Sequence, residues 1–191
     1  MSKCYCNFLI SMSIIAHTEF IFIFHLSTMN STITFETCFD AILLADSESA
    51  EIKAALALAD LYEDLLNKHS EASLFKDTEE TFLEGGVALA SQYALDCLRD
   101  PLRTTRFIAG TYEAIADQLQ THKTGKIKLL YAGCGPAAPL ALPFLHRFKP
   151  EQLQIVLLDI TESSLKVVRK LVKELALQDY IAEYVLADDI T

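Results

Sequence analysis

The sequence predicts an α/β protein in which a helical N-terminal extension precedes three parallel strands, the first half of a doubly wound sheet. Three observations support this fold class. A short apolar run is followed by a glycine turn at residues 133–135, a second run ends on Asp159, and a third ends on Asp188 and Asp189. Short apolar runs between turn residues are typical of buried strands, and a helical pattern separates the last two. We therefore expect residues 126–191 to carry the sheet.

Residues 1–28 differ in composition from the rest of the chain. Residues 8–26 are strongly apolar and nearly long enough to span a membrane, but Glu19 lies within them. A charge at the centre of a membrane span costs about 2.5–3.5 kcal/mol. A signal peptide is not indicated either, since Lys3 is the only basic residue before the run and no small-residue cleavage pattern follows. Two interpretations remain: translation that begins at Met29, which we favour, and a membrane anchor.

Residues 29–122 are expected to form a helical lead-in to the sheet. Apolar side chains recur there at intervals of three and four residues, which places them on one face of a helix. Gly85 and Gly86 are expected to open a third helix, which Pro101 interrupts. The predicted helices cover residues 35–43, 52–66, 87–100 and 104–119, with a polar loop at residues 70–80.

The glycine turn predicts a binding site for a nucleotide-type cofactor. Leu129 to Ala132 have the pattern of a buried strand, and Gly133 and Gly135 then allow a sharp turn against which a ligand can lie. An apolar helix pattern at residues 140–145 follows. The N-terminus of such a helix would present free backbone N–H groups to the ligand.

Acidic residues follow the second and third predicted strands. Asp159 follows the strand at residues 153–158 and lies 24 residues after Gly135, near the spacing at which an acid accepts hydrogen bonds from the ribose hydroxyls of a cofactor. Thr161 is expected to cap the next helix, whose apolar positions recur between residues 165 and 175. The third strand, residues 181–187, stops at Asp188.

This series of motifs resembles the class I S-adenosylmethionine-dependent methyltransferases. Their first motif is an acid, a small residue and then Gly-x-Gly-x-Gly; here Tyr131 replaces the acid and Ala137 replaces the third glycine. The resemblance implies a Rossmann-like sheet that binds S-adenosyl-L-methionine, with Asp159 on the ribose and Asp188 near the adenine amino group. The cofactor-binding residues that we expect are Gly133, Cys134, Gly135, Asp159, Asp188, Asp189 and, from the segment described next, Arg103.

Residues 98–115 resemble the helix that precedes the first strand in protein arginine methyltransferases. The matching positions are Asp100, Arg103, Thr104, Phe107, Ala114 and Ile115. The resemblance implies that Arg103 grips the carboxylate of the cofactor, and a guanidinium suits this role because it donates two parallel hydrogen bonds. The alternative is a surface arginine paired with Asp100 or Asp96.

Each motif also has a plain structural interpretation. The glycines could form an ordinary turn, Asp159 could cap the following helix, and Asp188 and Asp189 could be a solvated pair. The spacing from Gly133 to Ala138 also fits the dinucleotide fingerprint of an NAD(P)-dependent oxidoreductase. Two further residues, Pro136 and Pro139, argue against that class, because they occupy the helix start where a pyrophosphate needs N–H groups. A non-catalytic helical interaction module is the third possibility.

The reaction is less well defined than the cofactor. Three strands can be placed before Thr191, whereas the family that the chain resembles has seven, and no catalytic base can be named. We therefore expect the N-terminal part of a longer methyltransferase, inactive by itself. Its methyl acceptor, a protein side chain or a small molecule, and its oligomeric state are left open.

The composition of the chain argues against several classes of binding partner. The net charge of −10 argues against nucleic acid, whose binding requires a basic surface. The five cysteines show no metal-binding spacing, so we expect no metal site. Scattered cysteines, odd in number, are typical of a cytoplasmic protein with reduced thiols, and we expect no stable membrane association.

Overall fold

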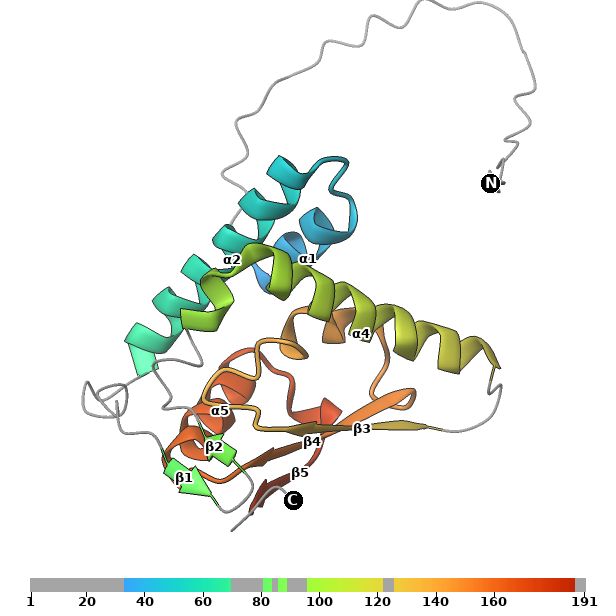
Figure 1. Ribbon diagram of the computed structural model, residues 1–191. Helices are drawn as coiled ribbons and strands as arrows, with labels where there is room; N and C mark the ends of the chain where they lie inside the picture. Colours follow the sequence, from blue (N-terminus) through green and yellow to red (C-terminus); the bar gives the residue numbers. More distant parts are fainter. Residues whose placement is uncertain (1–32, 70–80, 84–85, 89–95, 122–125, 188–191) are drawn as a thin grey trace, which may run out of the picture. The chain divides into compact units, whose positions relative to one another are not determined.

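A computed structural model describes residues 33–69, 81–83, 86–88, 96–121 and 126–187. The described helices are α1 (Phe35–Leu43), α2 (Glu48–His69), α4 (Pro101–Thr121) and α5 (Glu162–Glu174). They accompany a parallel sheet of β3 (Ile127–Ala132), β4 (Leu153–Asp159) and β5 (Ile181–Leu186), as Figure 1 shows. The predicted α/β class, with helices followed by three parallel strands, is confirmed. The apolar run at residues 8–26, Met29, Asp188 and Asp189 lie outside the described residues.

The sheet has the order β3-β4-β5, with β4 in the middle. In the register of the two parallel pairs, Ala132 lies beside Leu158, and Asp159 lies beside Leu186. Because the strands are parallel, their carboxyl ends meet at one edge. The residues that follow β3 and β4 are therefore neighbours in space although they are far apart in the sequence.

One face of the sheet is covered by helices. Alternate residues of β4 are fully buried, namely Leu153, Ile155 and Leu157, whereas the residues between them are half-buried. Alternation with a period of two places one set of side chains on a single face. Helix α5 packs against β4 and β5, and α4 packs against β3. The buried side chains of α5 are Ser164, Leu165, Val167, Val168, Leu171 and Val172.

Helix α5 begins where it was predicted, but the expected capping hydrogen bond is not formed. Thr161 is the N-cap residue, and its side chain makes no capping hydrogen bond. Its backbone N–H donates instead to Oδ1 of Asp159 at 2.9 Å. An aspartate that bonds a backbone N–H two residues later forms a local turn, which here directs the chain from β4 into the helix.

The N-terminal helices pack through aromatic side chains. Helix α1 begins with a reciprocal cap, in which Thr37 N–H donates to the Thr34 hydroxyl at 3.2 Å and Thr34 N–H donates to the Thr37 hydroxyl at 2.9 Å. Its fully buried Phe39 contacts Tyr112 of α4, and its Phe35 contacts Tyr62 of α2. The lead-in helices and the sheet thus share one hydrophobic core.

Helix α4 begins three residues earlier than predicted. Pro101 occupies its first position, where the missing N–H would be unpaired in any case and the fixed φ favours the helix. The Asp100 carboxylate accepts the N–H of Arg103 at 3.1 Å, as an N-cap does. Proline therefore starts this helix, and the helical turn at residues 97–99 ends directly before it, as the expected interruption at Pro101 requires.

The predicted start of the third helix, at residues 87–88, is also wrong. Residues Gly86–Ala88 form strand β2, which pairs in antiparallel fashion with β1 (Thr81–Leu83). Two residues that include a glycine separate these strands, a spacing typical of a hairpin. Nearer Pro101, within residues 96–100, the structure describes the 3-10 helix η1 (Cys97–Arg99), which Asp96 precedes as its N-cap residue.

None of the helices within the described ranges combines the length and the apolar character that a membrane crossing requires.

Candidate cofactor-binding site

The candidate site lies at the carboxyl edge of the sheet, where the glycine loop leaves β3. Gly133 has φ 67° and Gly135 has φ 60°, both in the left-handed region that L-residues with a Cβ disfavour. A Cβ placed on Gly133 would meet no atom within 4 Å. The glycine at position 133 is therefore required by its backbone conformation and not by crowding, and the space beside it is open.

Asp159 connects this loop to β4. Its side chain is buried, with 7% of the residue exposed, and Oδ2 accepts the N–H of Gly135 at 2.8 Å. The neighbouring N–H of Cys134 donates to the carbonyl of Leu158 at 3.1 Å. Asp159 is thus not a simple helix cap, because each carboxylate oxygen accepts a backbone N–H from a different segment. A carboxylate has about four acceptor positions, so two remain for a ligand.

The chain beyond the glycine loop differs from the prediction. No α-helix begins there; successive turns lead to the 3-10 helix η2 (Leu142–Arg147). Three prolines, at positions 136, 139 and 143, lack an N–H and restrict the backbone, and Ala138 has φ 41°. The predicted helix N-terminus is therefore missing from the loop. A pyrophosphate would lack the aligned N–H groups that it needs.

Cys134 fills the interior of the loop. Its side chain is buried, and this burial raises the pKa of the thiol to about 12, with the nearby Asp159 carboxylate adding to the rise. A thiol with such a pKa is neutral at physiological pH, and it is the thiolate that acts as nucleophile or metal ligand. The residue thus contributes volume and a main-chain N–H. Among the described residues no cluster of three or more potential metal ligands occurs.

Tyr131 occupies the position at which the resembled family has an acid. The side chain is half-buried at the end of β3, and burial raises the pKa of its phenol. A backbone hydrogen bond with Leu140 and the positive charge of Arg103 act in the opposite direction. The hydroxyl is neutral at physiological pH. The structure thus places a neutral hydroxyl, and no carboxylate, at this position.

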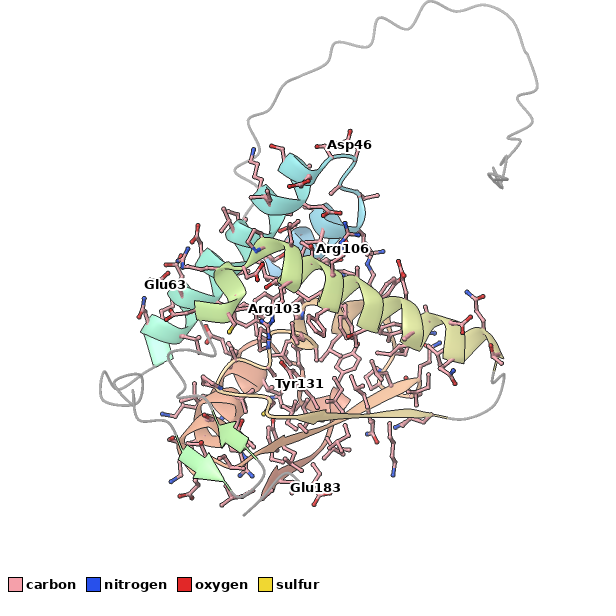
Figure 2. The ribbon with its side chains drawn as sticks, in the orientation of Figure 1. Asp46, Glu63, Arg103, Arg106, Tyr131 and Glu183 are labelled. Atoms are coloured by element: carbon pink, nitrogen blue, oxygen red, sulfur yellow. The ribbon has the colours of Figure 1, made fainter. Side chains whose placement is uncertain are left out.

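Arg103 extends from the first turn of α4 toward the region of Tyr131, as Figure 2 shows. Its Nη1 donates to the carbonyl of Cys97 at 3.4 Å, and the guanidinium lies 5.5 Å from the centre of the Phe107 ring. Asp100, the suggested salt-bridge partner, accepts the backbone N–H of Arg103. Arg103 is thus close enough to Tyr131, the residue that begins the first motif, for its charge to lower the pKa of that phenol.

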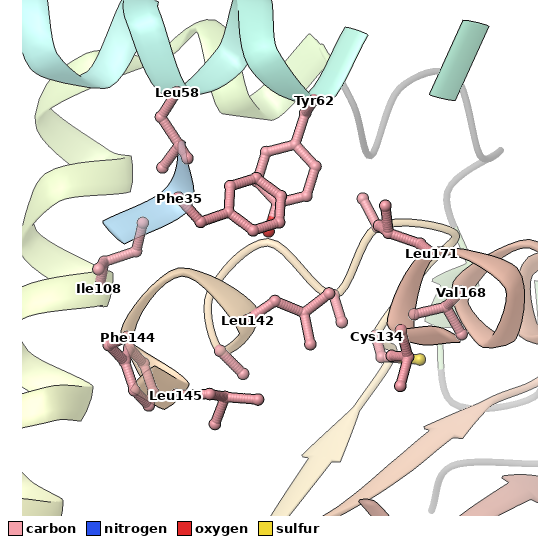
Figure 3. Close-up of a cluster of buried hydrophobic side chains, with 14 of the residues drawn as sticks. Phe35, Leu58, Tyr62, Ile108, Cys134, Leu142, Phe144, Leu145, Val168 and Leu171 are labelled. Atoms are coloured by element: carbon pink, nitrogen blue, oxygen red, sulfur yellow. The ribbon is translucent and has the colours of Figure 1, made fainter. Parts of the chain in front are cut away.

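Tyr62 is the residue that sequence reasoning missed. It is fully buried on α2, and its hydroxyl has no hydrogen-bond partner. The ring packs 4.5 Å from that of Phe35, and the hydroxyl points toward the chain that follows β3 (Figure 3). Burial raises the pKa of Tyr62 well above its usual value, and Tyr131 and Cys38 add to the rise, so the phenol is neutral at physiological pH. In the sequence, Tyr62 lies in the apolar pattern of its helix, so no signal separated it from a core residue.

Two predicted residues cannot be placed. Asp188 and Asp189 lie outside the described residues, which end at Ala187. The N–H of Ala187 donates to the backbone carbonyl of Asp159 at 3.1 Å, so the chain reaches the carboxyl edge of the sheet directly before the pair. Their assignment to the adenine stays a prediction.

Comparisons with known proteins give weak similarity to one solved structure and no match to a family. No family model matches the chain, and no curated protein matches it. Among solved structures, the chain is similar to the N-terminal domain of human METTL16, with 20% identity and a TM-score of 0.34. The similarity covers 68% of this chain, which spans 55% of the length of that domain. This likeness is too distant to bear on function, which must be inferred from the site itself.

Proposed function

We propose that this chain contains the cofactor-binding part of an S-adenosylmethionine-dependent methyltransferase. The observation that carries the proposal is the hydrogen bond between the glycine loop and Asp159 at the carboxyl edge of three parallel strands. In open α/β sheets, ligands bind outside this edge. In this proposal residues 126–191 hold the cofactor, residues 29–122 form the lead-in, and the methyl acceptor is a protein side chain or a small molecule.

The described residues suit positioning better than acid–base chemistry. Transfer of a methyl group from a sulfonium is an in-line displacement, so such an enzyme mainly orients donor and acceptor and excludes water. The glycine loop would support the cofactor with bare main chain, and Asp159 would bind the ribose through its remaining acceptor positions. We assign no catalytic base.

The nicotinamide alternative is less well supported. Dinucleotide sites place a pyrophosphate on the N-terminus of the helix that follows the glycine loop. Here the loop leads into turns that contain Pro136 and Pro139, and the six-residue η2 begins only at Leu142. A methionine moiety has no phosphate and does not require that helix.

Isothermal titration of the 191-residue chain with S-adenosylmethionine, S-adenosylhomocysteine, NAD and NADP tests the proposal. We expect both adenosyl ligands to bind in the micromolar range and neither nicotinamide to bind measurably. Binding of NAD or NADP without S-adenosylhomocysteine would favour the oxidoreductase. A chain that binds none of the four would leave the helical interaction module as the better hypothesis.

A further inference from the structure

We propose that the face of the parallel sheet opposite the helices is a self-association surface, on which a second copy of this chain packs. In this dimer, β3 of each copy lies over β5 of the other, and the two-fold axis is parallel to the strands. The apolar residues of the face form the centre of the contact, and one charged residue on each edge strand flanks it. Such an assembly would form whichever cofactor the carboxyl edge of the sheet binds.

The face opposite the helices is apolar. Neighbours in the strand register share a face, so Leu130 lies on this face with Val156, and Ala132 lies on it with Leu158 and Val185. The residues of β4 between them are the buried ones that the helices cover. Leu130 is 59% exposed, and the three other large side chains are half-buried. Parallel sheets normally have both faces covered, so this face requires a second layer.

The charged residues that the three strands place on this face are one cation and one anion, at opposite edges. Lys128 lies on β3 beside Gln154, and Glu183 lies on β5 beside Val156; both charged side chains are exposed. Figure 2 shows Glu183 on the side of the sheet that faces away from α4. The two charged residues differ in height by two positions along the strands, about 7 Å, which long side chains can span.

This arrangement of charges is complementary to itself. A two-fold axis parallel to the strands exchanges the positions of β3 and β5 and leaves the strand direction unchanged. The lysine of each copy then lies opposite the glutamate of the other, and the same contact occurs twice, as in every isologous interface. A second copy therefore supplies both the apolar layer and the opposite charges that the face lacks.

The size of the face determines the strength of the dimer. Strands about 4.8 Å apart and about six residues long make a three-stranded face of roughly 300 Å². Stable complexes bury about 800 Å² on each partner. We therefore expect a weak, reversible dimer whose population depends on the protein concentration.

Analytical ultracentrifugation of the 191-residue chain at increasing concentrations tests this dimer. We expect the weight-average mass to rise from that of the monomer toward twice that value. Leu130→Gln should raise the dissociation constant about tenfold to a hundredfold, because each dimer loses the burial of two leucines. Leu186→Gln is the matched control and should leave the constant unchanged. Leu186 is also an exposed leucine on an edge strand, but it lies beside Asp159 on the other face.

Charge reversal tests the arrangement of the two copies. Lys128→Glu and Glu183→Lys should each raise the dissociation constant about tenfold, because like charges then meet at both edges of the contact. An equimolar mixture of the two variants should associate as tightly as the wild type, since every facing pair is again of opposite charge. Both positions are exposed, so the thermal midpoint of each variant should match that of the wild type.

Three results would overturn the inference. The first is a mass that stays at that of the monomer at every concentration. The second is a dimer that Leu130→Gln leaves unchanged, because it would use another surface. The third is a mixture of the two charge variants that associates no more tightly than either variant alone, because the strands would then not face each other as proposed.

Discussion

The backbone N–H of Gly135 donates a hydrogen bond to Oδ2 of Asp159 over 2.8 Å, across 24 residues of sequence. The glycine loop and the acid after the second strand are therefore one structural unit. The second oxygen of Asp159 accepts the N–H of Thr161, so the same carboxylate also fixes the turn that enters α5. A change in Asp159 must alter both the loop and the turn.

Replacing Asp159 with asparagine should therefore affect stability as well as binding. The amide keeps one acceptor oxygen but turns its NH₂ donor toward one of the two backbone N–H groups, which loses its partner. We expect the free energy of unfolding to fall by about 1–3 kcal/mol. The affinity for S-adenosylhomocysteine should fall about tenfold or more, because the loop is no longer held.

Chemical denaturation and calorimetric titration measure the two effects, with Asp179→Asn as a control at an exposed position. The control should leave both quantities unchanged. Unaltered stability in Asp159→Asn would show that the two backbone hydrogen bonds contribute little to the fold.

Two glycines allow the conformational requirement of the loop to be measured. A Cβ would meet nothing within 4 Å at Gly110 or at Gly133, and of these two glycines Gly133 has a positive φ and Gly110 does not. Gly133→Ala should thus lower the free energy of unfolding by about 1–2 kcal/mol, because an L-residue is strained in this region. Gly110→Ala should raise it by about 0.5–1 kcal/mol, since alanine favours the interior of a helix. Denaturant titration of both variants tests this, and equal shifts would contradict it.

Arg103→Lys should weaken cofactor binding more than stability. Lysine keeps the charge but cannot donate two parallel hydrogen bonds to a carboxylate. We expect about a tenfold to hundredfold loss of affinity for S-adenosylhomocysteine. Arg106→Lys is the control. Arg106 lies three residues further along α4, and its Nη2 is 3.6 Å from Oε2 of Glu51. If Arg103→Ala binds as the wild type does, Arg103 is a surface residue.

The sheet could be predicted because its signals are local. Each strand is a short apolar run with a glycine or an acid at its end, and parallel strands place those ends at one edge. The position of Asp159 beside the glycine loop follows directly from that rule. The path of the chain after the loop could not be predicted from apolar spacing. Leucines recur at helical spacing in residues 140–145, but the three prolines prevent an α-helix there.

Tyr62 marks the limit of sequence reasoning at the site. A tyrosine in an amphipathic helix has the same pattern whether its hydroxyl is bonded, solvated or unpartnered. The distinction depends on tertiary packing, which places the Tyr62 ring against Phe35 and leaves its hydroxyl without a hydrogen-bond partner among the described residues. The misplaced third helix has a related cause, since the paired strands β1 and β2 contain apolar residues that a helix could also bury.

His146 makes the stability of the contact between α1 and η2 depend on pH. Burial lowers the pKa of His146 below its usual value of 6.5, and the charge of Arg147 adds to this effect; Glu36, Asp40 and the backbone of Pro143 act in the opposite direction. Asp40 lies 3.8 Å from Nε2 of His146 and is already paired with Arg147. The folded state therefore keeps His146 neutral at a pH where the unfolded chain is protonated.

The sign of this dependence follows from proton linkage. Below about pH 6.5 the unfolded state binds more protons than the folded state at this position, so the free energy of unfolding falls as the pH falls toward the lower, folded-state pKa. We expect the thermal midpoint of the wild type to decrease between pH 7 and pH 5 more steeply than that of His146→Phe. Phenylalanine retains a ring against Phe39 but does not titrate. The other four histidines are common to both chains, so their effects cancel in the comparison. Parallel pH profiles for the two chains would show that His146 titrates alike in the folded and unfolded states.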